Sequence, residues 1–165
     1  MSAPVSEPKS SRVVLTHPLG WIASGLGAGL SPRAPGTFGS LAALLPWFFW
    51  LRVQPPAIYL GVVALTFAIG VLAAQWVIDQ TRIEDPSVVV CDEFIGQWLA
   101  LFLAPAGWLW IAGGFALFRL FDIWKPWPVS WADNKLHGGF GAMFDDLLAG
   151  AYALIVLQAI HYLIP

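Results

Sequence analysis

Long apolar stretches separated by short polar segments dominate the sequence. The run from Ala57 to Ile78 contains no charged residue, and about twenty apolar residues let a helix cross a bilayer core of about 30 Å. The run from Leu147 to Ile164 is also uncharged and follows directly after two aspartates. Both runs predict membrane-spanning helices.

Two further apolar stretches contain residues that break or bend helices. The first, Phe38 to Leu51, is rich in Trp and Phe and predicts a short span bent near Pro46. The second, Phe94 to Phe118, is uncharged but is divided by Pro105 and Gly107. This segment forms either a shallow helical hairpin or one kinked span.

The N-terminal region differs from the rest of the chain. Residues 1–16 are polar and contain Pro and Ser, so we expect a flexible tail before a single membrane-embedded domain over residues 17–165. Seven Gly and Pro residues interrupt the stretch from Gly20 to Gly36, which predicts a glycine-rich interfacial or re-entrant segment. The whole pattern predicts an all-α integral membrane protein with about three to five membrane-embedded helices.

Composition supports a membrane location and excludes other classes. Hydrophobic residues make up 58% of the chain and charged residues 11%, a balance that suits lipid better than water. A formal net charge of −2 argues against binding to nucleic acid, which requires a basic surface. The single cysteine, Cys91, excludes an intramolecular disulfide. No pattern predicts an oligomeric state.

The acidic residues are clustered. Apart from Glu7, they lie between Asp79 and Glu93, at Asp122 and Asp133, and at Asp145 and Asp146. Carboxylates are costly to bury, so their grouping at the ends of apolar segments indicates a shared role, and binding a hard divalent cation is the obvious one. Seven of the eight Lys and Arg residues lie in the same polar stretches, which favours a phosphate as the anion that meets this cation.

The two alternatives for residues 94–118 predict different topologies. A hairpin would place all three acidic clusters on one side of the membrane, together with every Lys and Arg except Arg52, and this side would be cytoplasmic. A single straight span would separate the clusters. The basic residues on the shared side would be Lys9, Arg12, Arg33, Arg82, Arg119, Lys125 and Lys135.

Two polar motifs flank the divided apolar segment. Asp92 and Glu93 are adjacent carboxylates at the predicted start of a helix, where they bind metal or cap the helix. Arg119, Asp122 and Lys125 recur at intervals of three, which places them on one helix face. They form a metal and phosphate site or, alternatively, a solvated ladder of salt bridges.

A third motif precedes the last apolar run. A glycine-rich loop after His137 leads to Asp145 and Asp146 at a predicted helix start. The loop approaches a ligand while the aspartates bind Mg²⁺, or it is a turn followed by capping residues. His137 is either the proton donor for a leaving alkoxide or a hydrogen-bonding loop residue.

A fourth motif, from Ser31 to Ser40, precedes the first short span. Its free backbone N–H groups and Arg33 make a phosphate cradle plausible, with Thr37 and Ser40 as further contacts. Capping of the following helix by Thr37 or Ser40 is an equal alternative.

The four motifs in this order resemble the phosphatidylglycerophosphatase A family, from about Thr16 to Ile160. The resemblance implies a bacterial inner-membrane enzyme that depends on Mg²⁺ and removes the terminal phosphate of phosphatidylglycerophosphate. The strings that carry it are Pro35 to Ser40, Asp92 to Gly96, Arg119 to Pro128, and Gly138 to Gly150.

The expected chemistry is metal-assisted hydrolysis of a phosphomonoester at the cytoplasmic boundary. Direct attack by water is favoured, because the position six after Cys91 is Gln97 and not the Arg of a cysteine phosphatase loop. Five carboxylates are expected to bind one or two Mg²⁺ ions, and one of them to act as general base: Asp92, Glu93, Asp122, Asp145 and Asp146. Arg119 and Lys125 are expected to bind the phosphate, with Arg33, Thr37 and Ser40.

Two other classes of protein compete with the enzyme. A small cation transporter or channel would bind a cation at the acidic clusters, but the long apolar runs carry no ionisable residue except His161 near an end. A purely structural subunit would not explain the convergence of Arg119, Asp122 and Lys125 with the other acidic motifs.

Overall fold

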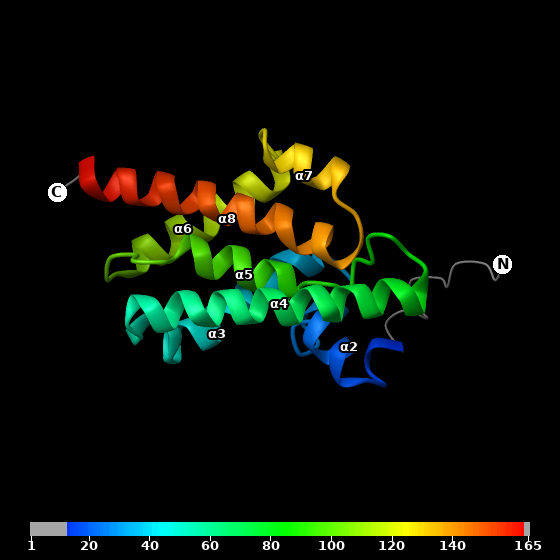
Figure 1. The fold of residues 1–165 in the computed structure, drawn as a ribbon. Coiled ribbons are helices and arrows are strands. Elements are labelled where there is room, and N and C mark those ends of the chain that lie inside the picture. Colours follow the sequence, from blue (N-terminus) through cyan, green and yellow to red (C-terminus); the bar gives the residue numbers. More distant parts are fainter. Residues whose placement is uncertain (1–12, 164–165) are drawn as a thin grey trace.

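Residues 13–163 are described by a computed structural model, and every regular element in this range is a helix (Figure 1). The all-α prediction is therefore confirmed. The elements are α2 (Pro18–Ala23), η1 (Ala28–Leu30), α3 (Pro35–Phe49), η2 (Leu51–Val53), α4 (Pro56–Thr81), α5 (Cys91–Ala100), α6 (Trp108–Trp124), α7 (Val129–Lys135) and α8 (Gly138–Leu163).

Two helices among the described residues, α4 and α8, are long and apolar enough to cross a membrane. Each has 26 residues, which corresponds to a length of about 39 Å. Only 28% of the most apolar window of α4 is buried inside the structure, so most of this apolar surface faces outward, as contact with lipid requires. A larger number of membrane-embedded helices stays a prediction.

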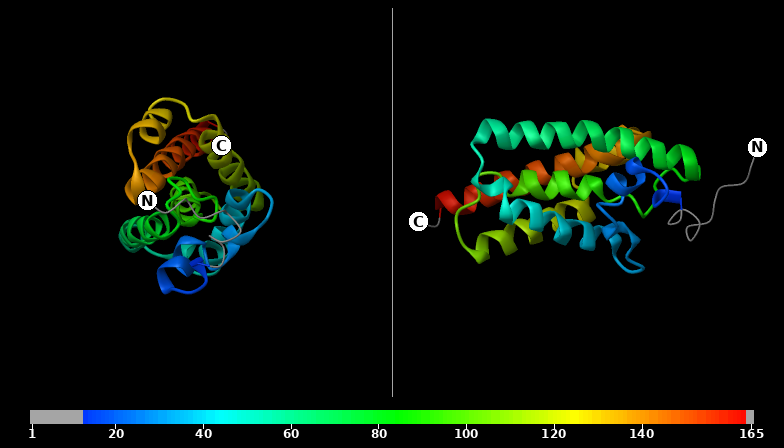
Figure 2. Two further views of the ribbon diagram at one scale, coloured as in Figure 1. Left: turned by 90° about the vertical axis from the view of Figure 1, so that its right-hand side faces the viewer. Right: turned by 90° about the horizontal axis from the view of Figure 1, so that it is seen from below.

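The short helix α5 lies at the centre of the bundle. Viewed along the helices, it is surrounded by α3, α4, α6 and α8 (Figure 2). Buried hydrogen bonds attach it to its neighbours: Trp98 Nε1 donates to the Ala43 carbonyl at 2.8 Å, and Tyr59 Oη donates to the Trp98 carbonyl at 2.6 Å. Because buried polar groups need partners, these bonds help to fix α5 against α3 and α4.

The divided apolar segment is a hairpin and not one kinked span. Helix α5 ends at Ala100, and α6 begins at Trp108, after Gly107 with a φ of 129° that favours glycine. The beginning of α5 and the end of α6 therefore lie at the same end of the bundle. This arrangement is what brings the polar motifs on the two helices together.

Several helix boundaries differ from the sequence prediction. Helix α3, which the sequence predicts as a short span, begins at Pro35 rather than at Phe38 and continues through Pro46. Helix α8 begins at Gly138, so the predicted glycine-rich loop is helical and the aspartates lie well inside the helix. The glycines serve close packing, because a Cβ at Gly139 would collide with the Val71 carbonyl of α4.

The N-terminal region agrees only in part with what the sequence predicts. The first twelve residues of the predicted tail lie outside the described residues, whereas Val14 is fully buried. The glycine-rich stretch from Gly20 to Gly36 contains α2, η1 and the start of α3, joined by turns. An interfacial position for this stretch stays a prediction.

Candidate functional site

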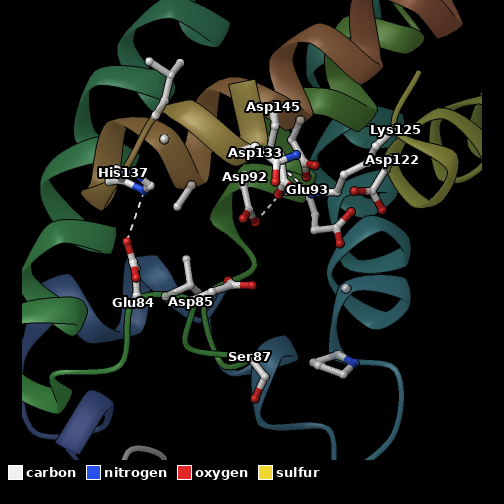
Figure 3. Close-up of a pocket in the computed structure, with 18 of the residues that line it drawn as sticks. Glu84, Asp85, Ser87, Asp92, Glu93, Asp122, Lys125, Asp133, His137 and Asp145 are labelled. Atoms are coloured by element: carbon white, nitrogen blue, oxygen red, sulfur yellow. Dashed lines mark hydrogen bonds and ion pairs between the residues drawn. The ribbon is translucent and has the colours of Figure 1, made fainter. Parts of the chain in front are cut away.

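One pocket at the end of the bundle gathers most of the acidic side chains of the chain. Its volume is about 640 Å³. The beginnings of α3, α5 and α8 line it, together with the α4–α5 loop, the end of α6 and α7. Among residues 13–163, the Lys and Arg residues that line it are Arg119 and Lys125. Eight of the ten acidic residues line it: Glu84, Asp85, Asp92, Glu93, Asp122, Asp133, Asp145 and Asp146. Figure 3 labels seven of them, all except Asp146.

Arg119 is the centre of the first ionic network. Its Nη1 lies 2.5 Å from Glu93 Oε2 and 2.9 Å from Asp122 Oδ2, which links the end of α6 to the start of α5. The Ser40 hydroxyl lies 2.8 Å from Glu93 Oε2. A Cβ at Gly36 would collide with Glu93 Oε1, so glycine at this position lets α3 approach the network.

Lys125 is the centre of the second network. It follows the last residue of α6 and adopts a left-handed conformation with φ 48°. Its Nζ lies 2.5 Å from Asp133 Oδ1 and 2.7 Å from Asp145 Oδ2. The predicted position on one helix face is therefore wrong for Lys125, whose partners come from α7 and α8. Arg119 and Asp122 are paired on α6, as their spacing of three residues predicts.

Asp92 and Asp146 form no ion pair within residues 13–163. Asp146 is 5% exposed, and Asp92 Oδ1 accepts a hydrogen bond from the Glu93 backbone N–H at 2.8 Å. Two carboxylates that are sheltered and unpaired are costly in the absence of a counter-ion.

The pKa values of the α5 carboxylates reflect this shelter. Burial raises the pKa of Asp92 well above its usual range, and the charge of Glu93 raises it further. Burial also raises the pKa of Glu93 to about 7, although the charge of Arg119 opposes the shift. Without a cation, these carboxylates compete with one another for protons near neutral pH.

The two basic residues remain charged. Burial lowers the pKa of Arg119, but the charge of Glu93 and the hydrogen bond to it outweigh this effect, so the pKa is raised. Burial likewise lowers the pKa of Lys125, and its bonds to Asp133 and Asp145 more than compensate. Both side chains can therefore bind an anion throughout the physiological pH range.

The donor chemistry of the pocket fits Mg²⁺. Carboxylate oxygens are its preferred protein ligands, and eight acidic side chains against two basic ones leave a negative excess that repels a phosphate unless a cation is present. Within residues 13–163, no three Asp, Glu, His or Cys side chains are already gathered as a metal cluster. Glu93, Asp122 and Asp145 are instead held by Arg119 and Lys125.

The predicted phosphate-binding residues are not all in the pocket. Thr37 lines it, whereas Ser40 lies buried behind Glu93, and Arg33 is exposed outside the lining. Neither Thr37 nor Ser40 caps a helix, because α3 already begins at Pro35. The predicted capping role is therefore wrong for both residues.

His137 lies at the rim of the pocket. Its side chain is 67% exposed, and Nδ1 lies 3.1 Å from Glu84 Oε1 (Figure 3). Of the described histidines, it alone lines the pocket. Its position is thus at the boundary with water rather than among the buried carboxylates.

Three of the acidic residues that line the pocket have no individual role predicted from the sequence. Asp133 belongs to a recognised acidic cluster, but its partnership with Lys125 depends on the turn that returns α7 to the end of α6. Glu84 and Asp85 lie on the α4–α5 loop (Figure 3). In the sequence, the clustering of charge is the feature that points to these residues. Their partners cannot be read from the sequence, because they depend on the fold.

Comparison with known proteins identifies the family. A family model described as phosphatidylglycerophosphatase A matches residues 21–161. The chain belongs to the phosphatidylglycerophosphatase A family. The matched range contains every residue that lines the pocket.

Curated relatives agree with this membership. A phosphatidylglycerophosphatase A of Escherichia coli strain K12 is 41% identical, over 92% of this chain and 88% of the relative. The Haemophilus influenzae protein of the same name is also 41% identical, over 92% of this chain and 93% of the relative. A Bacteroides thetaiotaomicron protein, provisionally named a phosphatidylinositol-3-phosphatase, is 38% identical over 87% of this chain and 93% of its own length. No solved structure matches the chain.

Proposed function

We propose that this chain removes the terminal phosphate of phosphatidylglycerophosphate, and that carboxylates of the pocket bind Mg²⁺ for the reaction. Membership of the family supports the substrate. The observation that carries the assignment of the site is the convergence of three acidic clusters with Arg119 and Lys125 in one pocket. A phosphomonoesterase needs both kinds of charge, because the metal needs carboxylates and the phosphate needs cations.

Five carboxylates are proposed to hold the metal. Asp92 and Asp146 form no ion pair with the described basic residues, whereas the other three would exchange Arg119 or Lys125 for the metal. Bound Mg²⁺ would offset the charge of the phosphate and lower the pKa of a water molecule. The proposed ligands are Asp92, Glu93, Asp122, Asp145 and Asp146.

Arg119 and Lys125 are proposed to bind the phosphoryl oxygens once the carboxylates release them. A guanidinium binds two phosphate oxygens in a fixed planar geometry, and the ammonium of Lys125 would add a point charge. Thr37, which lines the pocket at the start of α3, would donate a hydrogen bond to the same group. Orientation of the phosphate between α3 and α6 follows from these three contacts.

The proton transfers are proposed for Asp92 and His137. Asp92 Oδ1 accepts the Glu93 N–H, which leaves Oδ2 to bind the metal or, if the metal does not occupy it, to take a proton from the attacking water. His137 stands at the water-facing rim and would protonate the leaving glycerol oxygen. The transporter alternative loses support, because the pocket lies at one end of the bundle and the family is enzymatic.

The pocket end of the bundle is proposed to face the cytoplasm of a bacterial inner membrane, with α4 and α8 as spans of a multi-pass protein. Among the described basic residues, Arg52 borders a second pocket beside the α5–α6 loop, at the opposite end of the bundle. Lys9 and Arg12 lie outside the described residues. The positive-inside tendency therefore favours this orientation.

Phosphate release by purified protein tests the proposal. The protein in detergent would be mixed with phosphatidylglycerophosphate, with Mg²⁺ or with a chelator, and with phosphatidylinositol-3-phosphate as the competing substrate. We expect release that requires Mg²⁺ and favours phosphatidylglycerophosphate. Absence of release with any divalent cation would contradict the enzymatic function, and equal release with the chelator would contradict the metal.

A further inference from the structure

Gln97 and Arg119 contain buried polar atoms that have no hydrogen-bond partner within residues 13–163. These atoms are Gln97 Nε2, Gln97 Oε1 and Arg119 Nε. Gln97 is fully buried on α5. An unpaired buried polar atom is costly, so these atoms require a physical explanation.

Gln97 and Arg119 belong to the parts of α5 and α6 that pack against each other. Gln97 follows Glu93 by four residues, so both side chains lie on one face of α5, about 6 Å apart along its axis. Glu93 binds Arg119. A Cβ on Gly96, the residue before Gln97, would collide with the ring of Phe118, the residue before Arg119. The face of α5 that carries Glu93 and Gln97 therefore lies near the part of α6 that carries Arg119.

The unpaired atoms are chemically complementary. Arg119 Nε–H is a donor, and Gln97 Oε1 is an acceptor. They are not bonded while Arg119 Nη1 is held by the carboxylates of Glu93 and Asp122. A neutral amide that accepts the Nε–H would keep the guanidinium in place without neutralising the charge that a phosphate requires.

We propose that Gln97 is a positioning residue, which accepts a hydrogen bond from Arg119 Nε–H when the guanidinium turns from Glu93 to a bound phosphate. This inference rests on the proposed function and adds a residue that does not line the pocket. Gln97 touches neither metal nor substrate. It holds the Nε–H of Arg119 while the Nη atoms of the same guanidinium bind the anion.

The inference separates stability from phosphate binding. If Gln97 had only a structural role, Gln97→Met would remove an unpaired amide from the core and leave phosphate binding unchanged. In our account, the same variant is more stable without ligand but binds phosphate about ten-fold more weakly, because Arg119 Nε–H then has no acceptor in the bound state. The opposite signs of the two effects are the distinguishing feature.

The experiment measures thermal unfolding in detergent with Mg²⁺ over a range of inorganic phosphate concentrations. For Gln97→Met, we expect a higher melting temperature without phosphate and a ten-fold shift in the phosphate dependence. Gln158→Met is the matched control, because the Gln158 amide already donates to the Phe102 and Leu103 carbonyls. It should lower the melting temperature without changing the phosphate dependence.

A double-variant comparison tests whether Gln97 acts through Arg119. A lysine side chain has N–H donors only at its terminal ammonium and none at the position of Arg119 Nε. Gln97→Met should therefore cause no further loss of phosphate affinity in an Arg119→Lys background. An equal loss in both backgrounds, or a Gln97→Met protein with the phosphate affinity of the wild type, would overturn the inference. A wild-type protein that neither binds phosphate nor hydrolyses the lipid would overturn the proposed function, and this inference with it.

Discussion

Arg119 Nη1 lies 2.5 Å from Glu93 Oε2, so an ion pair joins the C-terminal half of α6 to the first turn of α5. The pair is sheltered, with side-chain exposures of 16% and 9%. It closes the open end of the hairpin and holds the principal cation of the pocket beside a carboxylate. The same contact therefore contributes to both stability and function.

Removal of Arg119 is expected to destabilise the protein. Arg119→Met leaves Glu93 and Asp122 sheltered without their partner, at a cost of about 3 kcal/mol. The Arg119→Met/Glu93→Gln variant should recover part of the lost stability, because the unpaired charge of Glu93 is then absent. Both variants are measured by thermal unfolding in detergent without divalent cation. Neither variant should hydrolyse the lipid. No recovery in the double variant would show that the pair is unimportant for stability.

Gly36 is expected to be essential because of its distance from Glu93. In Gly36→Ala, the new methyl group collides with Glu93 Oε1 and displaces the carboxylate, which should lower kcat by about 100-fold. Gly61→Ala is the matched control, because a Cβ at Gly61 meets no atom within 4 Å. It should leave kcat unchanged. Similar effects of both substitutions would contradict the role of the close approach.

Arg33 is expected to contribute little, although the sequence makes it a candidate for phosphate binding. The structure places its side chain on the surface and outside the pocket lining. Arg33→Gln should therefore change kcat/KM by less than about two-fold, whereas Arg119→Gln should lower it by at least about 100-fold. A large loss in Arg33→Gln would show that Arg33 reaches the substrate.

The stability of the metal-free protein is expected to fall as pH rises. The pKa of Glu93 is raised from 4.5 to about 7, so between these values the folded protein binds more protons than the unfolded chain. Stability is then lost as pH rises through this window. Melting temperatures with chelator should decrease from about pH 5 to about pH 8, and saturating Mg²⁺ should reduce the decrease. Melting temperatures that rise with pH under chelator would contradict this sign.

The sequence predicts the meeting of the acidic clusters because this depends on few features. The break at Pro105 and Gly107 permits a hairpin, and the hairpin brings Glu93 and Arg119 to one end. Counting Lys and Arg residues favoured the same arrangement. Hydropathy therefore predicts which segments form helices. The helix breakers predict at which end of the bundle each polar motif lies.

Side-chain partners depend on features that the sequence does not reveal. Ser40 faces Glu93 because of the rotation of α3 about its axis, and Lys125 turns to Asp133 and Asp145 because α6 ends just before it. The aspartates of α8 were expected at a helix start, but close packing against α4 extends the helix to Gly138. Rotation and close packing are tertiary properties, which residue spacing alone does not determine.

Binding of Mn²⁺ in place of Mg²⁺, measured by electron paramagnetic resonance on the purified protein, tests the central claim most directly. We expect the wild type and Asp79→Asn to bind Mn²⁺ equally, since Asp79 lies outside the pocket and accepts a hydrogen bond from Gln75. Asp92→Asn/Asp146→Asn should weaken binding by at least about 100-fold. Unchanged affinity in this double variant, or an equal loss in Asp79→Asn, would contradict a metal site built from the pocket carboxylates.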